Sequence, residues 1–311
     1  MKQMNKRVYG ILGISSIMSN WNADFTGYPK STNDNKIFGS DKAFKYPMKK
    51  MWESQGEKIL YIKSYKIEKG SIIPKTLKER YEQLFGEIGK DGVQVIKNLF
   101  QALDVKNFGA TFAEEGSNIS ITGAAQIGQG FNFYKDSDSI EQQILSPFRD
   151  GKGKVDKNTK EETEAKNSTL GTKIVSDEAH YFYPFAINPL AYQEYINLGF
   201  TEGYTEEDYQ KFKEASTSAA NSFSTNAKIG CDNEFALFVE TEVDTYLPTL
   251  APYVVFDKNS GKNTITLNIA SLLEENKKIK DIEVYYNPET TIFITDIKEY
   301  KAYNIVTKKG I

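Results

Sequence analysis

An apolar stretch near the N-terminus, Arg7 to Ile17, places the strongest constraint on the fold. It is rich in β-branched residues and predicts a buried strand. The chain then enters a loop, residues 20–30, of Asn, Asp, Gly and Pro, which turn a chain and leave backbone N–H groups exposed. Ser40 or Asp41 can cap a helix that begins soon afterwards. A strand, a polar loop and a helix start in this order predict an anion-binding site.

The predicted helix carries lysines at helical spacing. Lys42, Lys45 and Lys49 recur at i, i+3 and i+7, so their side chains share one face beside an apolar stripe. Pro47 lies inside the pattern, and we expect it to kink or split the helix. Two interpretations remain open. The lysines bind an extended polyanion, or they are only the solvent-exposed face of an amphipathic helix, which is the commoner role.

The net charge of −3 conceals an uneven distribution along the chain. Residues 1–100 hold 18 Lys and Arg against 10 Asp and Glu, and the remainder holds 21 against 32. A basic first third can form a positive groove although the whole chain is slightly acidic. It can equally bind the acidic part of a second copy.

The counts of cysteine and histidine exclude several chemistries. Cys231 is the only cysteine, so no intrachain disulfide can form, and we expect a cytoplasmic protein. His180 is the only histidine, which excludes a histidine metal cluster and acid–base chemistry based on two histidines. No segment is long and apolar enough to cross a membrane. We therefore expect no cofactor, no metal and no membrane association.

The rest of the chain alternates between predicted strands and helices. Strands are expected at 58–65, 104–112, 118–127, 144–148, 180–187, 234–242, 264–269, 282–286 and 291–294, and helices at 75–85, 93–103, 190–198, 205–220 and 270–277. We expect the strand pair 104–112 and 118–127 to pack against the first strand, and 234–242 to lie at the sheet centre. This order suits an α+β fold with a split βαβ, ferredoxin-like sheet.

The segment from Arg149 to Lys173 differs in composition from the chain around it. It holds few large apolar residues and many Lys, Glu, Gly, Thr and Asn, so it cannot bury enough surface to fold alone. Strand-like sequences flank it on both sides. We therefore predict a long protruding hairpin or flexible loop, of a kind that is usually functional or disordered.

Seven short segments occur in an order that resembles one known family. They are Asn22-Ala-Asp-Phe-Thr-Gly27, Gly39-Ser-Asp-Lys-Ala-Phe-Lys45, Asp104-Val-Lys-Asn-Phe-Gly-Ala110, Thr122-Gly-Ala-Ala-Gln-Ile127, Leu170-Gly-Thr-Lys173, Gly203-Tyr-Thr-Glu-Glu-Asp208 and Ser224-Thr-Asn-Ala-Lys-Ile-Gly230. Together they resemble the backbone subunit of CRISPR Cascade complexes, the Cas-seven family of the RAMP superfamily, and most closely its subtype I-B branch. The resemblance covers nearly the whole chain.

The resemblance implies a single domain over residues 1–311 with an RRM-like (ferredoxin-like) palm, a finger-like helical insertion at about 55–103 and a thumb-like β-hairpin at about 145–185. It implies a non-enzymatic subunit for antiviral defence. Several copies form a helical filament along a CRISPR RNA, which pairs with target DNA. Other Cascade subunits (the foot or cap, the large subunit and the crRNA-processing endonuclease) are the further partners. Such a subunit must hold any guide sequence, so it should bind phosphates and leave base edges free.

The resemblance also places candidate RNA-binding residues. They are Asn22, Gly27, Lys30, Ser40, Lys42, Lys45 and Lys49 in the guide groove, Lys106 and Gln126 on adjacent strands that face the RNA, and Lys173 and Lys228 at positions where relatives are basic. Phe108 is either a base-stacking residue or, as is commoner, a core residue.

Two other functions remain alternatives at this point. Asp24 occupies a loop position whose counterpart in type III relatives takes part in RNA cleavage, so the chain could be a guide-directed ribonuclease. A lone aspartate in such a loop more often caps a turn. The 19 Tyr and 19 Phe also fit a sugar- or peptide-binding module, although aromatic residues in strands are usually core.

Overall fold

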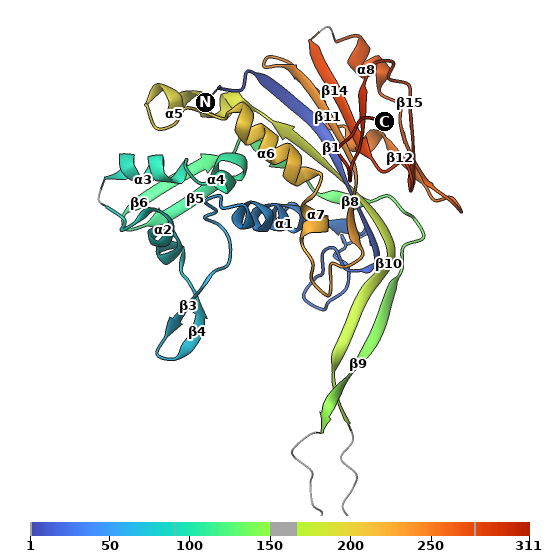
Figure 1. Ribbon diagram of the computed structural model, residues 1–311, viewed down its shortest axis with the longest axis horizontal. Helices are drawn as coiled ribbons and strands as arrows, with labels where there is room; N and C mark the ends of the chain where they lie inside the picture. Colours follow the sequence, from blue (N-terminus) through green and yellow to red (C-terminus); the bar gives the residue numbers. More distant parts are fainter. Residues whose placement is uncertain (1, 90, 150–166, 277) are drawn as a thin grey trace, which may run out of the picture.

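Strand β1 (Lys6–Ser19) lies at the centre of the molecule in the computed structural model, which describes residues 2–89, 91–149, 167–276 and 278–311 (Figure 1). It pairs antiparallel with β10 (Asn167–Ile187) on one side and β11 (Cys231–Glu242) on the other. Most of β1 from Val8 to Ser16 is buried on both faces, as a continuous apolar run requires. The strand predicted at Arg7 to Ile17 is therefore confirmed.

Among the described residues, the main sheet has nine strands. Its path is β16 (Lys301–Asn304), β14 (Ile279–Tyr286), β11, β1, β10, β8 (Gly130–Asn132) and β2 (Phe38–Gly39), while β7 (Ala125–Ile127) and β9 (Ser139–Arg149) also pair with β10. The segment predicted as sheet centre, 234–242, falls in β11 and is confirmed as a buried strand beside β1.

Each face of the main sheet supports its own core. Leu12 of β1 packs with the helices, whereas its neighbour Ile11 packs against a small sheet on the opposite face, because side chains alternate along a strand. The small sheet consists of β12 (Val254–Asp257), β13 (Asn263–Leu267) and β15 (Thr291–Thr295). The main sheet is thus the middle of three layers, with α and β elements mixed as expected.

The helices lie mainly on one face of the main sheet (Figure 1). They are α1 (Asp41–Ser54), α2 (Leu77–Phe85), α3 (Gly92–Leu99), α4 (Leu103–Phe108), α5 (Gln193–Asn197), α6 (Glu206–Ser216), α7 (Ala219–Ser222) and α8 (Ala270–Glu274), with 3₁₀ turns at Pro189–Tyr192 and Ala251–Tyr253. Helices are confirmed within 75–85 (α2) and, with shifted bounds, 93–103 (α3), whereas 205–220 contains two helices, α6 and the start of α7. The predicted helix 190–198 begins as a 3₁₀ turn before α5, and 270–277 contains α8, although residue 277 lies outside the described part of the chain. None of the helices in the described part of the chain combines the length and apolar character that a membrane span requires.

Helix α1 runs through Pro47 as one element, so the expected split there is wrong. Proline removes one backbone hydrogen bond, and burial of the same face offsets that loss. Phe44, Met48 and Trp52 are each no more than 1% exposed. Tertiary packing therefore maintains a helix that sequence alone would break.

Two strand predictions are wrong. In the segment 58–65, predicted as a strand, residues 58–64 are irregular, and β3 (Tyr65–Glu68) begins only at the last residue of the prediction. The reason is that the Asp104 carboxylate accepts the N–H groups of Leu60 and Tyr61 at 2.9 and 2.8 Å. Arg80 donates to the Ile59 carbonyl in the same segment. These side chains take the place of a partner strand. Residues 104–108, also predicted as strand, belong to α4.

The predicted pair 104–112 and 118–127 does not pack as one unit against β1. Strands β5 (Gly109–Glu114) and β6 (Ser117–Thr122) form a separate two-stranded sheet, and only β7 joins the main sheet, through β10. Gly123 lies at the break between β6 and β7. A Cβ placed there would be 2.3 Å from the Gly109 nitrogen, so only glycine allows the two backbones to come so close.

Two hairpins extend from the body. Strands β9 and β10 continue their antiparallel ladder well beyond the main sheet, as Figure 1 shows. This fits the protrusion predicted for Arg149 to Lys173, although residues 150–166 of that prediction lie outside the described part of the chain. The second hairpin pairs β3 with β4 (Ser71–Pro74) and projects below α2 (Figure 1).

Candidate nucleic-acid interface

The loop between β1 and α1 is fixed by hydrogen bonds from its own polar residues. Asn22 Oδ1 accepts the Ser40 N–H at 2.7 Å, and the Asn22 carbonyl accepts the Lys30 N–H at 2.8 Å. The Gly27 carbonyl accepts from Asn20 Nδ2 at 2.9 Å, with Gly27 at φ +94°. Four of the predicted site residues, Asn22, Gly27, Lys30 and Ser40, therefore belong to one ordered loop.

Ser40 caps α1 as predicted. Its hydroxyl accepts the Ala43 N–H at 3.3 Å, which leaves other N–H groups of the first turn available to an anion. Asp41 lies in the same turn and is acidic, so the charge at this helix start depends on the nearby lysines.

Asp24 caps the turn at the tip of the loop. Its Oδ1 accepts hydrogen bonds from the Thr26 hydroxyl at 2.7 Å, the Thr26 N–H at 2.8 Å and the Tyr28 N–H at 3.2 Å. These bonds, chiefly that of the Thr26 hydroxyl, lower the pKa of Asp24 below its ordinary value. Among the described residues, no group of three or more His, Cys, Asp and Glu is arranged to hold a metal ion.

A cleft of about 670 Å³ runs along α1. Its lining includes residues of α1 and residues from the elements opposite, namely Lys42, Lys45 and Lys49 on one wall and Tyr61, Phe108 and Thr111 on the other. The three lysines therefore share one face, as their spacing predicted. Asp41, Tyr46 and Ser120 also line the cleft.

The three lysines of this cleft have different surroundings. Lys42 is exposed and pairs with no carboxylate in the described part of the chain. Lys45 Nζ lies 2.8 Å from Asp41. Lys49 Nζ lies 3.6 Å from the buried Asp104 and donates to the Tyr61 carbonyl at 3.2 Å, and burial lowers its pKa. Lys42 is consequently the lysine most available to a ligand.

Phe108 serves the core more than the cleft. Its ring stacks on Trp52 with centroids 5.7 Å apart, and Lys45 Nζ lies over it at 5.1 Å. Of the two roles considered for Phe108, packing is the one this geometry favours.

A second set of candidate residues lies near the C-terminal end of β1. Lys228 Nζ donates to the carbonyls of Asn20 (2.6 Å) and Trp21, and burial lowers its pKa. Lys173 Nζ contacts Asn226 Oδ1 at 3.2 Å. Both lysines thereby connect the loop before β11, the base of the β9–β10 hairpin and the β1–α1 loop.

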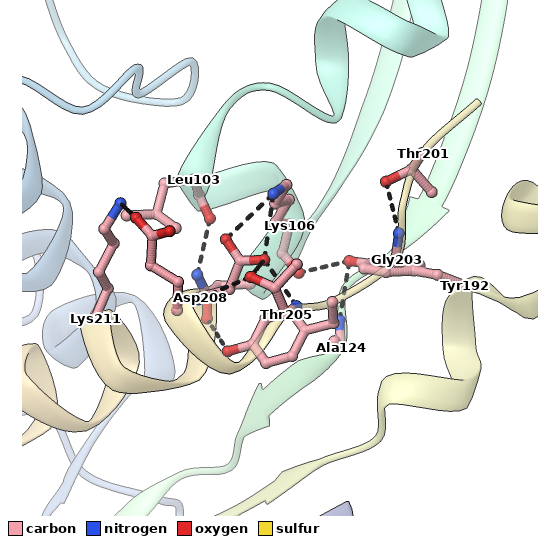
Figure 2. Close-up of polar contacts among 12 residues, drawn as sticks. Leu103, Lys106, Ala124, Tyr192, Thr201, Gly203, Thr205, Asp208 and Lys211 are labelled. Atoms are coloured by element: carbon pink, nitrogen blue, oxygen red, sulfur yellow. Dashed lines mark hydrogen bonds and ion pairs between the residues drawn. The ribbon is translucent and has the colours of Figure 1, made fainter. Parts of the chain in front are cut away.

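Lys106 and Gln126 lie away from these residues. Lys106 is on helix α4, not on a strand, and its Nζ lies 3.2 Å from both carboxylate oxygens of Asp208 (Figure 2). Asp104 and Phe108, two residues before and two residues after Lys106, contact lysines of α1. Lys106 therefore points to the opposite side of α4. Gln126 is exposed on β7 and lines a different cleft, beside Pro184 and Leu250.

Some residues of the site were not among the predicted site residues. Asp104 and Asp208, which pair with Lys49 and Lys106, are distant in sequence from their partners. Phe25, at the tip of the β1–α1 loop, is completely exposed. An aromatic residue between Asp24 and Thr26 in a polar loop is a sequence signal for such an exposed side chain.

The chain is similar to a known protein family and to chains of solved structures. A family model described as CRISPR-associated protein Cas7 matches residues 6–287. A chain of a solved structure described as "CRISPR RNA-guided surveillance complex, pre-nicking" is similar over 96% of both chains, with 15% identity and a TM-score of 0.54, a similarity of fold. A chain of a "CRISPR RNA-guided surveillance complex" covers 89% of this chain and 88% of its own, with 13% identity and a TM-score of 0.40. No curated protein matches the sequence.

Proposed function

This chain belongs to the Cas7 family of CRISPR-associated proteins, and on that premise we propose that it is a crRNA-binding backbone subunit of a type I surveillance complex, Cascade. Several copies bind side by side along one guide RNA and support its pairing with target DNA in antiviral defence. The family match over residues 6–287 is the observation that carries this proposal. The cleft on α1 supports it, because Lys42, Lys45 and Lys49 line one wall and lysine side chains contact phosphates.

In this proposal the backbone of the guide follows the β1–α1 loop and the start of α1. Lys42 supplies an exposed ammonium group, and the N–H groups near Ser40 supply further donors. Lys30, which is exposed in this loop, and Lys173, which lies on β10 of the hairpin, supply further cationic groups. Phosphates are held while the bases remain free to pair, as any guide sequence requires.

The finer description of the fold belongs to the same proposal. The antiparallel order β11, β1, β10 and then β7 or β8 supports an RRM-like palm. We assign the β9–β10 hairpin as the thumb and residues 55–103 as a finger-like insertion in a single domain. The seven ordered sequence segments support subtype I-B, with the foot or cap, the large subunit and the crRNA-processing endonuclease as further partners. The single cysteine supports a cytoplasmic location.

Purification tests the proposal directly. Protein expressed with its CRISPR array should elute as large particles with a high 260/280 absorbance ratio, and RNase should reduce them or leave RNA of guide length protected. A monomer free of nucleic acid in both treated and untreated samples would contradict the proposal. That result would favour the sugar- or peptide-binding alternative.

A matched pair of lysine variants tests the site. Lys42→Ala should weaken RNA binding and lower the slope of log affinity against log salt by about 0.7 for each phosphate that the protein no longer neutralises. Lys50→Ala, on the same helix but paired with Glu53 at 2.6 Å, is the control and should leave both unchanged. Equal effects of the two variants would rule out a specific role for Lys42.

We further propose that the subunit is not an enzyme. The support is local: the Asp24 carboxylate already accepts three hydrogen bonds that shape its own turn. Incubation of the assembled complex with RNA complementary to its guide tests this. Cleavage that disappears with Asp24→Ala would establish the guide-directed ribonuclease instead.

A further inference from the structure

Phe25 is a completely exposed aromatic side chain, with a relative exposure of 109%. Single exposed apolar residues are common on protein surfaces, so exposure alone indicates nothing. Two other features set Phe25 apart: a backbone that is fixed on both sides of it, and a position between the start of α1 and the β9–β10 hairpin.

The turn that carries Phe25 is held by its neighbours. Asp24 Oδ1 accepts from Thr26 and Tyr28, the Asp24 N–H donates to the Tyr28 carbonyl at 2.8 Å, and Ala23 bridges to Pro29. The hydrogen bonds fix the backbone while the ring itself points away from the protein. A ring held in this way loses little conformational freedom on binding a ligand.

The turn also lies between the parts of the chain that we assign to RNA. On one side, Asn22 binds the N–H of Ser40 at the start of α1. On the other side, the Tyr28 hydroxyl donates to Glu141 of β9, and Asn20 Nδ2 donates to the Ile174 carbonyl of β10 at 3.2 Å. An RNA backbone that runs from the start of α1 to the β9–β10 hairpin therefore passes this turn.

We propose that Phe25 is a stacking platform for one base of the bound RNA strand in each subunit. Every base has a π face, so stacking holds a nucleotide without selecting its identity, which suits a subunit that accepts any guide. Tyr28 is the other exposed aromatic residue of the turn, but its hydroxyl is bound to Glu141 of β9. This inference rests on the proposed function and adds a contact with bases to the contacts with phosphates.

Three substitutions of Phe25 separate stacking from simple apolar contact. Affinity is measured by fluorescence anisotropy for oligoadenylate and oligouridylate of equal length. Phe25→Ala should weaken binding by about 5- to 100-fold for each subunit, and more for oligoadenylate, because adenine stacks more strongly. Phe25→Trp should retain binding. Phe25→Leu should resemble Phe25→Ala, and retained binding by Phe25→Leu would overturn stacking.

The salt dependence distinguishes this inference from the proposed function. Removal of an uncharged ring should leave the salt slope unchanged, whereas Lys42→Ala should reduce it. If Lys42→Ala weakens binding and Phe25→Ala does not, the stacking proposal fails and the RNA-binding function stands. If neither variant changes the affinity, the stacking proposal and the role of Lys42 both fail, whereas only a parent protein that binds no RNA would overturn the proposed function.

A fluorescent base locates the contact. RNA with 2-aminopurine at successive positions should show quenching at positions separated by a constant interval, and Phe25→Ala should remove it. Circular dichroism should show an unchanged fold, because the Phe25 ring is completely exposed. A lower particle mass for Phe25→Ala without RNA, with unchanged RNA affinity, would assign the ring to a contact between copies and overturn the proposal.

Discussion

Lys49 and Lys42 show that one spacing rule can place residues of different function on the same helix face. Lys49 pairs with Asp104, whose carboxylate has no exposed side-chain surface. Lys49→Ala leaves that buried charge with only backbone donors and should lower the free energy of unfolding by about 3 kcal/mol. Chemical denaturation measures this decrease.

Lys42→Ala is the matched control for this stability measurement. Lys42 is exposed and pairs with no carboxylate among the described residues, so its removal should change the free energy of unfolding by at most about 0.5 kcal/mol. A similar decrease for both variants would mean that the pair with Asp104 contributes little. RNA binding and stability are thus expected to depend on different lysines of the same cleft.

The candidate site could be predicted from sequence only where its residues are local. The β1–α1 loop and the Ser40 cap follow from the types of residue in one short segment, and both are present. Lys228 instead binds two main-chain carbonyls at the end of β1, and Lys106 binds Asp208 on another helix. Such partners are set by tertiary packing, which spacing does not reveal.

At the scale of the elements, His180 is a contact between the main sheet and strand β12 of the small sheet. On β10, its ring stacks on Phe256 of β12 at 4.0 Å, and it contacts Glu234 at 2.7 Å and Glu178 at 2.9 Å. Lys258 also pairs with Glu178 at 2.5 Å. Burial opposes protonation, but the two carboxylates outweigh it and raise the pKa of His180 above 6.5.

A raised folded-state pKa fixes the direction of the pH dependence. The protonated imidazole is favoured in the folded protein, so its contribution is complete below about pH 6.5 and is lost as the pH rises through the folded-state pKa. His180→Gln should be less stable than the parent at pH 6, with the difference shrinking by pH 9. Urea unfolding at several pH values tests this, and a constant difference would exclude the charged form.

The elements that sequence predicted correctly are those whose own residues determine their state. β1 and β11 are strongly apolar, and α6 begins with a complete capping box between Thr205 and Asp208. The wrong strand at 58–65 is rich in β-branched and aromatic residues, yet Asp104 and Arg80 bind its main chain. A segment such as 58–65 therefore adopts a structure that is determined by hydrogen bonds to side chains distant in sequence.

At the scale of the whole molecule, charge is divided along the chain, with residues 1–100 basic and the remainder acidic. Attraction between the basic part of one copy and the acidic part of the next favours a head-to-tail contact, which extends into a filament when its rotation does not close a ring. Such a contact between exposed charges weakens as salt rises, with a screening length of about 8 Å at physiological ionic strength. Copies in high salt should therefore separate unless RNA holds them together.

RNA of graded length tests this arrangement. If each copy occupies a fixed number of nucleotides, particle mass measured by light scattering should increase by one chain at equal increments of RNA length. Each added copy binds both the RNA and the preceding copy, so binding should become more cooperative on longer RNA. Lys42→Ala should preserve the increments while requiring more protein to fill them, because it removes a phosphate contact and leaves the protein contact intact. A mass that stays at two chains for every RNA length would show a closed dimer and exclude the filament.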